Sequence, residues 1–545
     1  MKKKLVIGLL FVFSFAIQSL CAQVKVLYDD SHGQTAGNAD WVVTGAYSDM
    51  ADMLKSQGFA IDSLSDVAPS KHISVELLAG YKALILAEPN NPYAQDEQNA
   101  IVSFVKNGGG AFLISDHGGA DRDNDGWDAV KALNSFCPQF GFQFDGNTFS
   151  EAPLAGAMNS SHPVMFGIKA VGAWAASTIS ILRAVDSTVV PLVDSRTKKA
   201  PFIVAAETGK GRIVAMGDSS PFDDGTGSGG KNKLHDSYDS FMYNHPQFAY
   251  NAMTWITGMV PAKRIPSKIV RLANEADPSE KGKNVFIDAA HGNAASDKME
   301  TFERHMAKLG FKVYYGLNLL TPDILEKFSI AILPDPSLPL LQGEIQVYSD
   351  WLMAGGSLFI AADWDSAPLK NIGTLNNLME KCGSVMRFNS DQVWDNQHKT
   401  NKPWGVLANT FKAGHPIFNG VKTIITWGTC SLITRDKTFL TESSGVEIWI
   451  SGDNDCLNKD GDKMNDAVIY PVGGNPPIPI MAMEKLVKGK LIALGCCNFT
   501  DYQYPDSDLN ASQSSPSPIK HETAEFYDNL IPWLAQNSQN VPFKK

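Results

Sequence analysis

The segment DEQNAIVSFVKNGGGAFLISDHGG, residues 96–119, joins an amphipathic helix pattern to an apolar strand. Asp96 is available to cap the helix, and a run of three glycines is typical of a helix end. The apolar positions have helical spacing and are Ile101, Val102, Phe104 and Val105. The sequence therefore predicts a helix over 96–106 followed by a buried strand over 111–115.

Strands and helices alternate around this segment. The β-rich runs are KVLYD at 25–29, FAIDSL at 59–64 and YKALILA at 81–87, and a helical pattern covers 45–57. Strand–helix–strand order with apolar strands favours a parallel sheet with helices on both faces and right-handed crossovers. We therefore expect an α/β fold with a doubly wound, flavodoxin-like parallel sheet.

The same pattern occurs twice along the chain. VLYDDSHGQ at 26–34 matches VFIDAAHGN at 285–293, which aligns His32 with His291. Four further blocks match in the same order, and their pairs are 101–116 with 348–363, 162–174 with 415–427, 209–224 with 487–502, and 251–256 with 529–534. We therefore predict a tandem duplication. The two doubly wound domains are expected at 23–262 and 283–540, with a linker at 263–282.

The first 22 residues have the pattern of a cleavable export signal. Three lysines precede an apolar run from Leu5 to Ile17, and small residues end at Ala22. The run is too short to span a bilayer. Lipidation at Cys21 is less favoured, because Leu20 occupies the preceding position, where a small residue is wanted. We expect export to the periplasm or the extracellular space.

The composition narrows the range of partners. Removing the signal takes the formal net charge from −11 to −14, and no cluster of lysine or arginine follows. This argues against nucleic acid and anionic lipid. No later stretch is apolar enough for a transmembrane segment. The cysteines lack the spacing of a disulfide scaffold or a CxxC zinc site, but a bridge is left open among Cys430, Cys456, Cys496 and Cys497.

Two acidic segments follow predicted strands of the first copy, DHGGADRDNDGWD at 116–128 and GDSSPFDDGTG at 217–227. Ligands of open parallel sheets bind where such loops converge, beyond the carboxyl ends of the strands. Converging carboxylates require a cation, protons or solvent to compensate their charges. These segments therefore predict a binding site on this edge of the sheet.

The run DRDNDG fits the first half of a calcium loop, with Asp121, Asp123 and Asp125 at alternate positions. It is no EF-hand, because the twelfth position is Ala132 rather than glutamate. We expect a divalent cation, calcium, as cofactor. The neighbouring loop would complete its ligands with Asp218, Asp223 and Asp224. The alternative is a solvated turn in which Asp128 caps the next helix.

The candidate catalytic residues are Asp116, His117 and His32. Each follows a predicted strand, where a base or ligand could reach a substrate. His32 and His291 recur in both copies, so a structural role that ties down neighbouring loops is the alternative. The second copy has Cys496 where the first has Asp218, and DWDSAPLKN at 363–371 replaces the acidic loop. We expect a complete site in the first copy alone.

Several other patterns carry less weight. GTGSGGK at 225–231 has the spacing of a phosphate loop, but Asn232 replaces the magnesium-binding Ser or Thr, and no GxSxG elbow occurs. The acidic insertion at 453–466 predicts a hydrophilic hairpin tip, with calcium binding as the alternative. Non-recurring tryptophans could stack on a sugar or pack within loops, and they are Trp41, Trp127, Trp364, Trp394 and Trp404.

The segment 96–119 resembles the class I glutamine amidotransferase-like superfamily, particularly its ThuA-like branch, in which a helix ending in glycines leads into a strand and a site loop. VLYDDSHGQ is similar to the opening strand of secreted domains that also carry both acidic segments. In true amidotransferases this strand leads to a nucleophilic cysteine, but Asp116 stands there, and the later His and Glu fall near Gly217 and Asp218. The resemblance thus implies the fold without thiol glutaminase chemistry.

These observations lead to one functional hypothesis and one alternative. We expect an exported protein of two amidotransferase-like domains, whose first copy binds a divalent cation and a carbohydrate-like small molecule or glycan. Sugars are favoured only by analogy with the ThuA-like branch. Any enzymatic activity would be that of a metal-assisted or carboxylate-mediated hydrolase. The alternative is a non-catalytic binding or scaffold protein with a structural calcium site.

Overall fold

The structure, a computed structural model, describes residues 23–151, 158–183, 186–225, 237–261, 263–293, 295–364, 372–462, 464–505 and 519–538. The predicted export signal with Cys21 lies outside the described residues, as do 226–236, which include most of GTGSGGK, and 365–371, which include most of DWDSAPLKN. Among the helices of the described part, none is long and apolar enough to cross a membrane.

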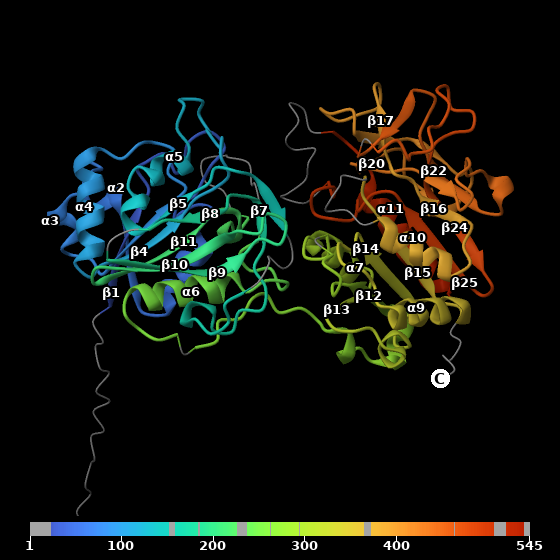
Figure 1. The fold of residues 1–545 in the computed structure, drawn as a ribbon. Coiled ribbons are helices and arrows are strands. Elements are labelled where there is room, and N and C mark those ends of the chain that lie inside the picture. Colours follow the sequence, from blue (N-terminus) through green and yellow to red (C-terminus); the bar gives the residue numbers. More distant parts are fainter. Residues whose placement is uncertain are drawn as a thin grey trace, which may run out of the picture.

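The first sheet has seven strands in the order β2-β1-β3-β4-β11-β10-β9 (Figure 1). Their bounds are β1 Val24–Asp29, β2 Phe59–Ser63, β3 Ala83–Ala87, β4 Gly110–Ile114, β9 Ser187–Asp194, β10 Pro201–Thr208 and β11 Gly211–Met216. The first five strands of this order are parallel, and β10 is antiparallel to both of its neighbours. The carboxyl ends of β3, β4 and β11 therefore lie side by side.

Helices cover both faces of this sheet. They are α1 Ser48–Ser56, α2 Leu64–Val67, α3 Val75–Leu78, α4 Gln95–Lys106, α5 Ala129–Asn134 and α6 His245–Ile256. Alternate residues of β1 enter different cores, since Val26 and Tyr28 pack in one cluster with α1 and α6, and Leu27 packs in the other with α4 and α5. This period of two, with helices on each side, is that of a doubly wound sheet.

The second sheet repeats the same strand order. Its eight strands run β13-β12-β14-β15-β25-β24-β22-β19, and the first seven correspond in order to those of the first sheet. Their bounds are β12 Asn284–Asp288, β13 Lys312–Gly316, β14 Ile330–Pro334, β15 Ser357–Ala361, β19 Thr410–Phe411, β22 Glu447–Ser451, β24 Pro479–Leu486 and β25 Gly489–Leu494. The predicted fold class, with two doubly wound α/β sheets, is confirmed.

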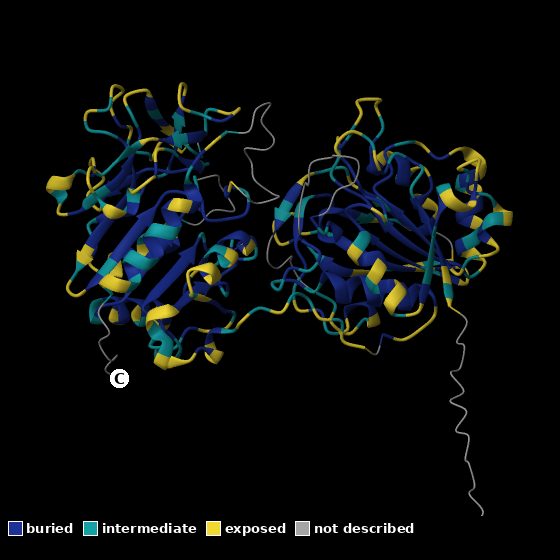
Figure 2. Ribbon diagram, turned by 180° about the vertical axis from the view of Figure 1, so that it is seen from behind, coloured by how far each residue is buried: buried dark blue, intermediate teal, exposed yellow. Residues whose placement is uncertain are grey.

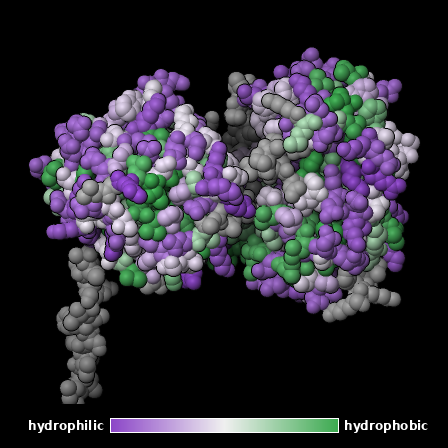
Figure 3. Space-filling view, viewed as in Figure 1, coloured by the Kyte–Doolittle hydropathy of each residue, from purple (hydrophilic) through white to green (hydrophobic). Residues whose placement is uncertain are grey.

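Five helices accompany the second sheet, α7 Glu300–Lys308, α8 Pro322–Leu325, α9 Gln342–Ala354, α10 Ile372–Lys381 and α11 Thr523–Asn537. Both sheets are buried, and exposed residues lie mainly on the outer sides of helices and in loops (Figure 2). On the face seen in Figure 3, hydrophilic residues dominate and hydrophobic ones form scattered patches.

Small two-stranded sheets stand beside the main ones. They pair β5 Phe142–Phe144 with β8 Ile179–Ile181, β6 Phe149–Glu151 with β7 Ala173–Ala176, β16 Met386–Phe388 with β21 Leu432–Thr434, β17 Asp391–Asp395 with β23 Cys456–Asp460, and β18 Gly405–Ala408 with β20 Ile424–Trp427. The hydrophilic hairpin tip expected at 453–466 is corrected in part. Residues 456–460 form strand β23, and Cys456 and Asn458 in it are buried.

Two local expectations also need correction. Helix α4 begins at Gln95, and Asp96 does not cap it; Glu97 Oε2 accepts the hydrogen bond from Ala94 N at 2.9 Å, while Asp96 pairs with His72. The six cysteines of the described residues are buried and none of them forms a disulfide, so the bridge left open by the sequence is not formed.

Candidate functional site

Three buried carboxylates lie together at the carboxyl ends of adjacent strands. Glu88 follows β3, Asp116 follows β4 and Asp218 follows β11, and none is more than 3% exposed. In addition to burial, the charges of Glu88 and Asp218 both raise the pKa of Asp116, and the charge of Glu88 also raises the pKa of Asp218. The predicted convergence of Asp116 and Asp218 is therefore seen, and Glu88 is a third member that the sequence analysis did not select.

Arg122 holds this carboxylate cluster together. Its Nε donates to Glu88 Oε1 at 2.6 Å, and its Nη2 donates to Asp116 Oδ2 at 2.8 Å. Its guanidinium also lies over the Trp41 ring, 5.7 Å from the centroid. The planar fork of an arginine suits two acceptors at fixed positions. The acidic segment thus contributes a cation, Arg122, to the cluster. The sequence pattern did not indicate this role, because five aspartates surround the arginine.

The cluster retains protons near neutral pH. Burial raises the pKa of Asp218 to about 7, against the hydrogen bonds from Trp174 N at 2.6 Å and Ser220 N at 2.9 Å, and the charge of Glu88 raises it further. Burial and the charges of Glu88 and Asp218 raise the pKa of Asp116 well above its usual range, although Arg122 opposes this. Such carboxyl groups titrate as a coupled set and can exchange protons with a substrate.

Some buried polar atoms around the cluster lack hydrogen bonds. Glu88 Oε2, Ser177 Oγ and Ser219 Oγ have no such partner among the residues that the structure describes. Ser219 follows Asp218, and Ser177 N donates to Gly217 O at 2.8 Å. Because buried polar groups are nearly always bonded, a polar ligand or water is expected to reach these atoms.

The backbone at Glu88 is also unusual. Its φ is +42°, and Asp335, which follows β14 at the corresponding place in the second domain, has a φ of +28°. Positive φ is uncommon outside glycine and persists where the surroundings impose it, as at ligand sites. In this fold the Glu88 carboxylate is held at the sheet edge at a cost in backbone strain.

The predicted cation ligands fall into separate groups. Asp121, Asp123 and Asp125 come together, with one carboxylate oxygen of each lying within 4.8 Å of the others. Asp121 also accepts hydrogen bonds from Asp125 N at 3.1 Å and Gly126 N at 2.8 Å, which close the loop. Three clustered carboxylates in a partly exposed loop are a donor set that a divalent cation accepts.

The expected completion of this group from the neighbouring loop is not seen. Asp224 Oδ2 accepts from Ser48 Oγ at 2.7 Å and Asp49 N at 2.9 Å, at the start of α1. Asp223 Oδ1 accepts from Gly225 N at 3.0 Å, and Asp218 belongs to the buried carboxylate cluster. These aspartates are thus engaged by other parts of the first domain rather than by the 121–125 loop.

The helix cap expected at Asp128 is confirmed, and its neighbour His117 remains at the edge of the site. Asp128 Oδ1 accepts from Lys131 N at 2.8 Å at the start of α5. The partly buried ring of His117 has its Nδ1 3.0 Å from Gly118 O, and the backbone N of His117 donates to Asp116 Oδ1 at 2.8 Å. The peptide of His117 therefore orients Asp116, while its ring contacts its own loop.

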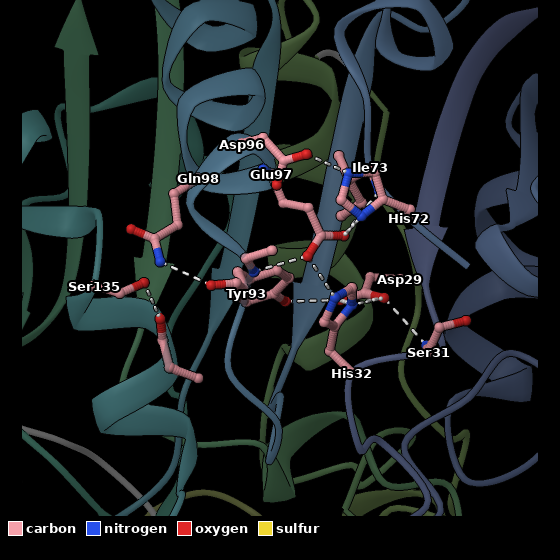
Figure 4. A network of polar contacts seen from close by, with 12 residues as sticks. Asp29, Ser31, His32, His72, Ile73, Tyr93, Asp96, Glu97, Gln98 and Ser135 are labelled. Atoms are coloured by element: carbon pink, nitrogen blue, oxygen red, sulfur yellow. Dashed lines mark hydrogen bonds and ion pairs between the residues drawn. The ribbon is translucent and has the colours of Figure 1, made fainter. Parts of the chain in front are cut away.

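His32 lies in a different network, shown in Figure 4. Its Nδ1 is 2.9 Å from Asp29 Oδ1, its Nε2 is 3.3 Å from Glu97 Oε2, and Tyr93 donates to Asp29 Oδ2 at 2.7 Å. Burial lowers the pKa of His32, but the two carboxylates outweigh it and raise the pKa to about 10. Burial raises the pKa of Glu97, but the hydrogen bonds from His32, Ile73 N and Ala94 N lower it to about 2. A protonated imidazole with both nitrogens engaged is no general base, so the geometry favours the structural alternative.

The second domain contains the same ion-pair network. His291 Nδ1 is 2.9 Å from Asp288 Oδ1, its Nε2 is 3.0 Å from Glu344 Oε2, and Tyr348 donates to Asp288 Oδ2 at 2.8 Å. Burial lowers the pKa of His291, but these carboxylates raise it to about 9. The network therefore ties the first strand of each sheet to the start of a helix, at α4 and at α9.

The carboxylate cluster itself is not repeated. At the same strand ends the second domain has Asp335, Asp363 and Cys496. Cys496 is fully buried and its Sγ donates to Gln503 Oε1 at 3.3 Å. A thiol thus replaces the carboxyl group of Asp218.

No protein-family model matches the chain, and no curated protein does. Among solved structures, the mmIFT52 N-terminal domain is 17% identical, with a TM-score of 0.34, over 46% of this chain and 97% of its own. A protein described as ThuA-like from Bacteroides uniformis is 18% identical, with a TM-score of 0.27, over 44% and 94%. A β-galactosidase from Bacillus circulans is 11% identical, with a TM-score of 0.28, over 58% and 38%. At such scores these likenesses carry no functional argument, and the fold rests on the strand order.

The His32 network generates a prediction about stability. We expect H32Q to lower the free energy of unfolding by about 3 kcal/mol or more, because it leaves two buried carboxylates without their cation. The matched control is H72Q. His72 is more exposed, pairs with Asp96 at 2.9 Å and lies 3.3 Å from Glu97 Oε1, but its loss leaves His32 in place, so it should cost less than about 1 kcal/mol. Urea unfolding of the full chain, followed by tryptophan fluorescence, measures both.

The pH dependence follows from the raised pKa of His32. Its stabilisation is complete below the usual value of 6.5 and is lost as the pH rises through about 10. The difference between wild type and H32Q should therefore shrink as the pH is raised from neutral towards 10. Equal stability of H32Q and H72Q at neutral pH would contradict the structural role.

Proposed function

We propose that the first domain is a carboxylate-mediated hydrolase that binds a neutral, carbohydrate-like ligand at the carboxyl edge of its sheet. The observation that carries this proposal is the convergence of Glu88, Asp116 and Asp218 from three adjacent strands around Arg122. Carboxyl groups of one site that differ in pKa can divide the roles of acid and base. Thiol glutaminase chemistry has no part, because Asp116 stands where the cysteine would be.

The raised pKa values support acid–base chemistry. With a pKa of about 7, Asp218 is present in both protonation states near neutral pH, where a general acid or base is most effective. Asp116, whose raised pKa keeps it protonated, would donate to the leaving oxygen, and ionised Asp218 would take a proton from the attacking water. Arg122 holds one oxygen of Asp116 and one of Glu88, so it orients both carboxyl groups.

The unpartnered atoms indicate the class of ligand. Glu88 Oε2 needs a donor, whereas Ser177 Oγ and Ser219 Oγ can donate or accept. A hydroxyl group is both donor and acceptor, so a hydroxyl-rich ligand satisfies all three. Carboxylates outnumber the arginine in the cluster, which disfavours anionic substrates. A sugar meets these requirements.

The remaining expectations fit this proposal. The chain would be an exported, duplicated protein of the ThuA-like branch, acting in the periplasm or outside the cell. Two sheets of the same strand order and a shared ion-pair network support the duplication. The second domain, with Cys496 at the place of Asp218, would then serve a role other than catalysis.

We also propose that Asp121, Asp123 and Asp125 hold a divalent cation, with calcium as the expected ion. Their carboxylate oxygens and their spacing at alternate positions fit a calcium ion. Arg122 lies between two of these aspartates, so an ion here would fix the segment that brings the guanidinium to Glu88 and Asp116. The ion contributes loop rigidity, and the carboxylates carry out the proton transfers.

The alternative is a non-catalytic binding or scaffold protein with the same calcium loop. The burial of all three carboxylates favours it, because Glu88 and Asp218 are fully buried and Asp116 is 3% exposed. In a scaffold the cluster would only order the loops around a bound glycan. Turnover separates the two functions.

Substitution of the carboxylates tests the catalytic proposal. Against a panel of oligosaccharides, with released reducing ends as the readout, D116N and D218N should each lower kcat by more than about 100-fold, because each removes an acid–base group. The matched control is D363N, the corresponding aspartate of the second domain, which should retain full activity. The wild-type rate should inflect near pH 7, and D218N should lose that inflection.

Two outcomes would decide against the hydrolase. Equal rates for D116N and D363N would remove the carboxylate cluster from the chemistry. Saturable glycan binding without turnover, weakened in D116N but not in D363N, would establish the scaffold alternative.

Calcium binding is tested by thermal unfolding. Calcium at about 100 times its Kd should stabilise the native chain by about 2.7 kcal/mol, because the ion binds the folded loop alone. The double variant D121N/D123N should lose this increase in Tm, whereas D223N/D224N, at the aspartates outside the loop, should keep it. A wild-type Tm unaffected by calcium and by chelator would contradict the proposal.

A further inference from the structure

A mixed cluster of histidine and aspartates lies in the second domain, away from the carboxylate cluster of the first. Asp395 ends β17, His398 follows three residues later, and Asp453 precedes β23. Strands β17 and β23 are antiparallel, with Asp395 opposite Cys456. This pairing brings the loop after β17 against the loop before β23.

One ligand atom of each of the three residues lies within 4.8 Å of the other two. His398 Nδ1 is 2.7 Å from Asp453 Oδ2 and 4.0 Å from Asp395 Oδ2. The other carboxylate oxygens are engaged, since Asp395 Oδ1 accepts from His398 N at 2.8 Å and Asp453 Oδ1 accepts from Asp455 N at 2.9 Å. One carboxylate oxygen of each aspartate and one imidazole nitrogen are thus held together by their own turns.

Asp395 is the unusual member of the group. It is 1% exposed, and its Oδ2 accepts only a weak hydrogen bond from Cys456 Sγ at 3.4 Å. Within the described residues, His398 is the only basic group that forms a salt bridge with Asp395 or Asp453. The contact between His398 and Asp453 can be explained as a surface ion pair. That explanation does not cover Asp395, a nearly buried carboxylate whose only basic neighbour in the described residues, His398, is 4.0 Å away. Buried charges are normally paired or bound to a metal.

We propose that Asp395, His398 and Asp453 bind one divalent transition-metal ion, and that Zn²⁺ is the best match. Zinc binds imidazole nitrogen and carboxylate oxygen at about 2.0–2.2 Å, so a tetrahedral site places its ligand atoms about 3.3 Å apart. The two distances from His398 Nδ1 bracket this value. Calcium and magnesium prefer oxygen ligands alone, which separates this site from the Asp121 loop.

Access and coordination number fit such an ion. The His398 side chain is 50% exposed, so an ion can enter from solvent. Three protein ligands leave a fourth position for water, the arrangement of zinc sites that are open to a substrate. The Cys456 thiol lies against Asp395 and helps to fix its Oδ2.

Isothermal titration of the chelator-treated full chain with ZnCl₂ tests the site. Wild type should bind one Zn²⁺ at this site. H398A and D453N should each bind it more than about 100-fold more weakly, because each removes a direct ligand, and loss of an outer-shell partner alone costs about 10- to 100-fold. H72A is the matched control, since His72 also pairs with an aspartate, Asp96, at the surface. D121N/D123N should bind Zn²⁺ at this site like wild type.

Folding and geometry have their own readouts. Circular dichroism should show H398A and D453N folded like wild type, because both side chains reach solvent. Co²⁺ should give visible absorption bands in wild type and H72A that are lost in H398A. Unchanged Zn²⁺ affinity in folded H398A or D453N, or no saturable binding by wild type, would overturn the proposal.

Discussion

The carboxylate cluster of the first domain depends on the hydrogen bonds that Arg122 donates to Glu88 and Asp116. Both carboxylates are nearly inaccessible to solvent, and Asp218 lies close enough for its charge to act on Asp116. Buried charges of one sign are tolerated only when a counter-charge or protons offset the loss of hydration. Arg122, which lies in the acidic loop, supplies the counter-charge. The raised pKa values of Asp116 and Asp218 favour their protonated, uncharged forms.

The His32 network and the carboxylate cluster of this domain differ in how many of their polar atoms have hydrogen-bond partners. In the His32 network both ring nitrogens, both oxygens of Glu97 and the Tyr93 hydroxyl are engaged, and the same arrangement surrounds His291. The carboxylate cluster leaves Glu88 Oε2 without a partner in the described structure and is not repeated at Cys496. A saturated, repeated network stabilises a fold, whereas an incomplete one can still bind a ligand.

The sequence predicted the parts of this site that follow from strand order. Asp116 and Asp218 converge because parallel strands end at one edge, and each follows an apolar run in the sequence, AFLI at 111–114 and IVAM at 213–216. Glu88 was missed, although it stands directly after an apolar strand, and Arg122 was missed because it was read as part of an acidic loop. Its position as the one cation among five aspartates of 116–128 was the available signal. Asp223 and Asp224 were misplaced because they bond to local backbone and to the start of α1, and spacing does not predict such contacts.

The tyrosines show why a repeat alone could not define these networks. Tyr93 stands four residues before Glu97, whereas Tyr348 stands four residues after Glu344, yet each phenol donates to the aspartate that ends the first strand. The two positions are eight residues apart in the alignment, since Tyr93 precedes α4 and Tyr348 lies in the second turn of α9, yet the hydroxyls reach equivalent atoms. In these two networks the hydroxyl oxygen therefore occupies an equivalent place, although the tyrosine that carries it differs in sequence position. Asp395 is likewise held in place by the pairing of β17 with β23, a long-range contact, whereas Asp121 is held by hydrogen bonds within its own loop.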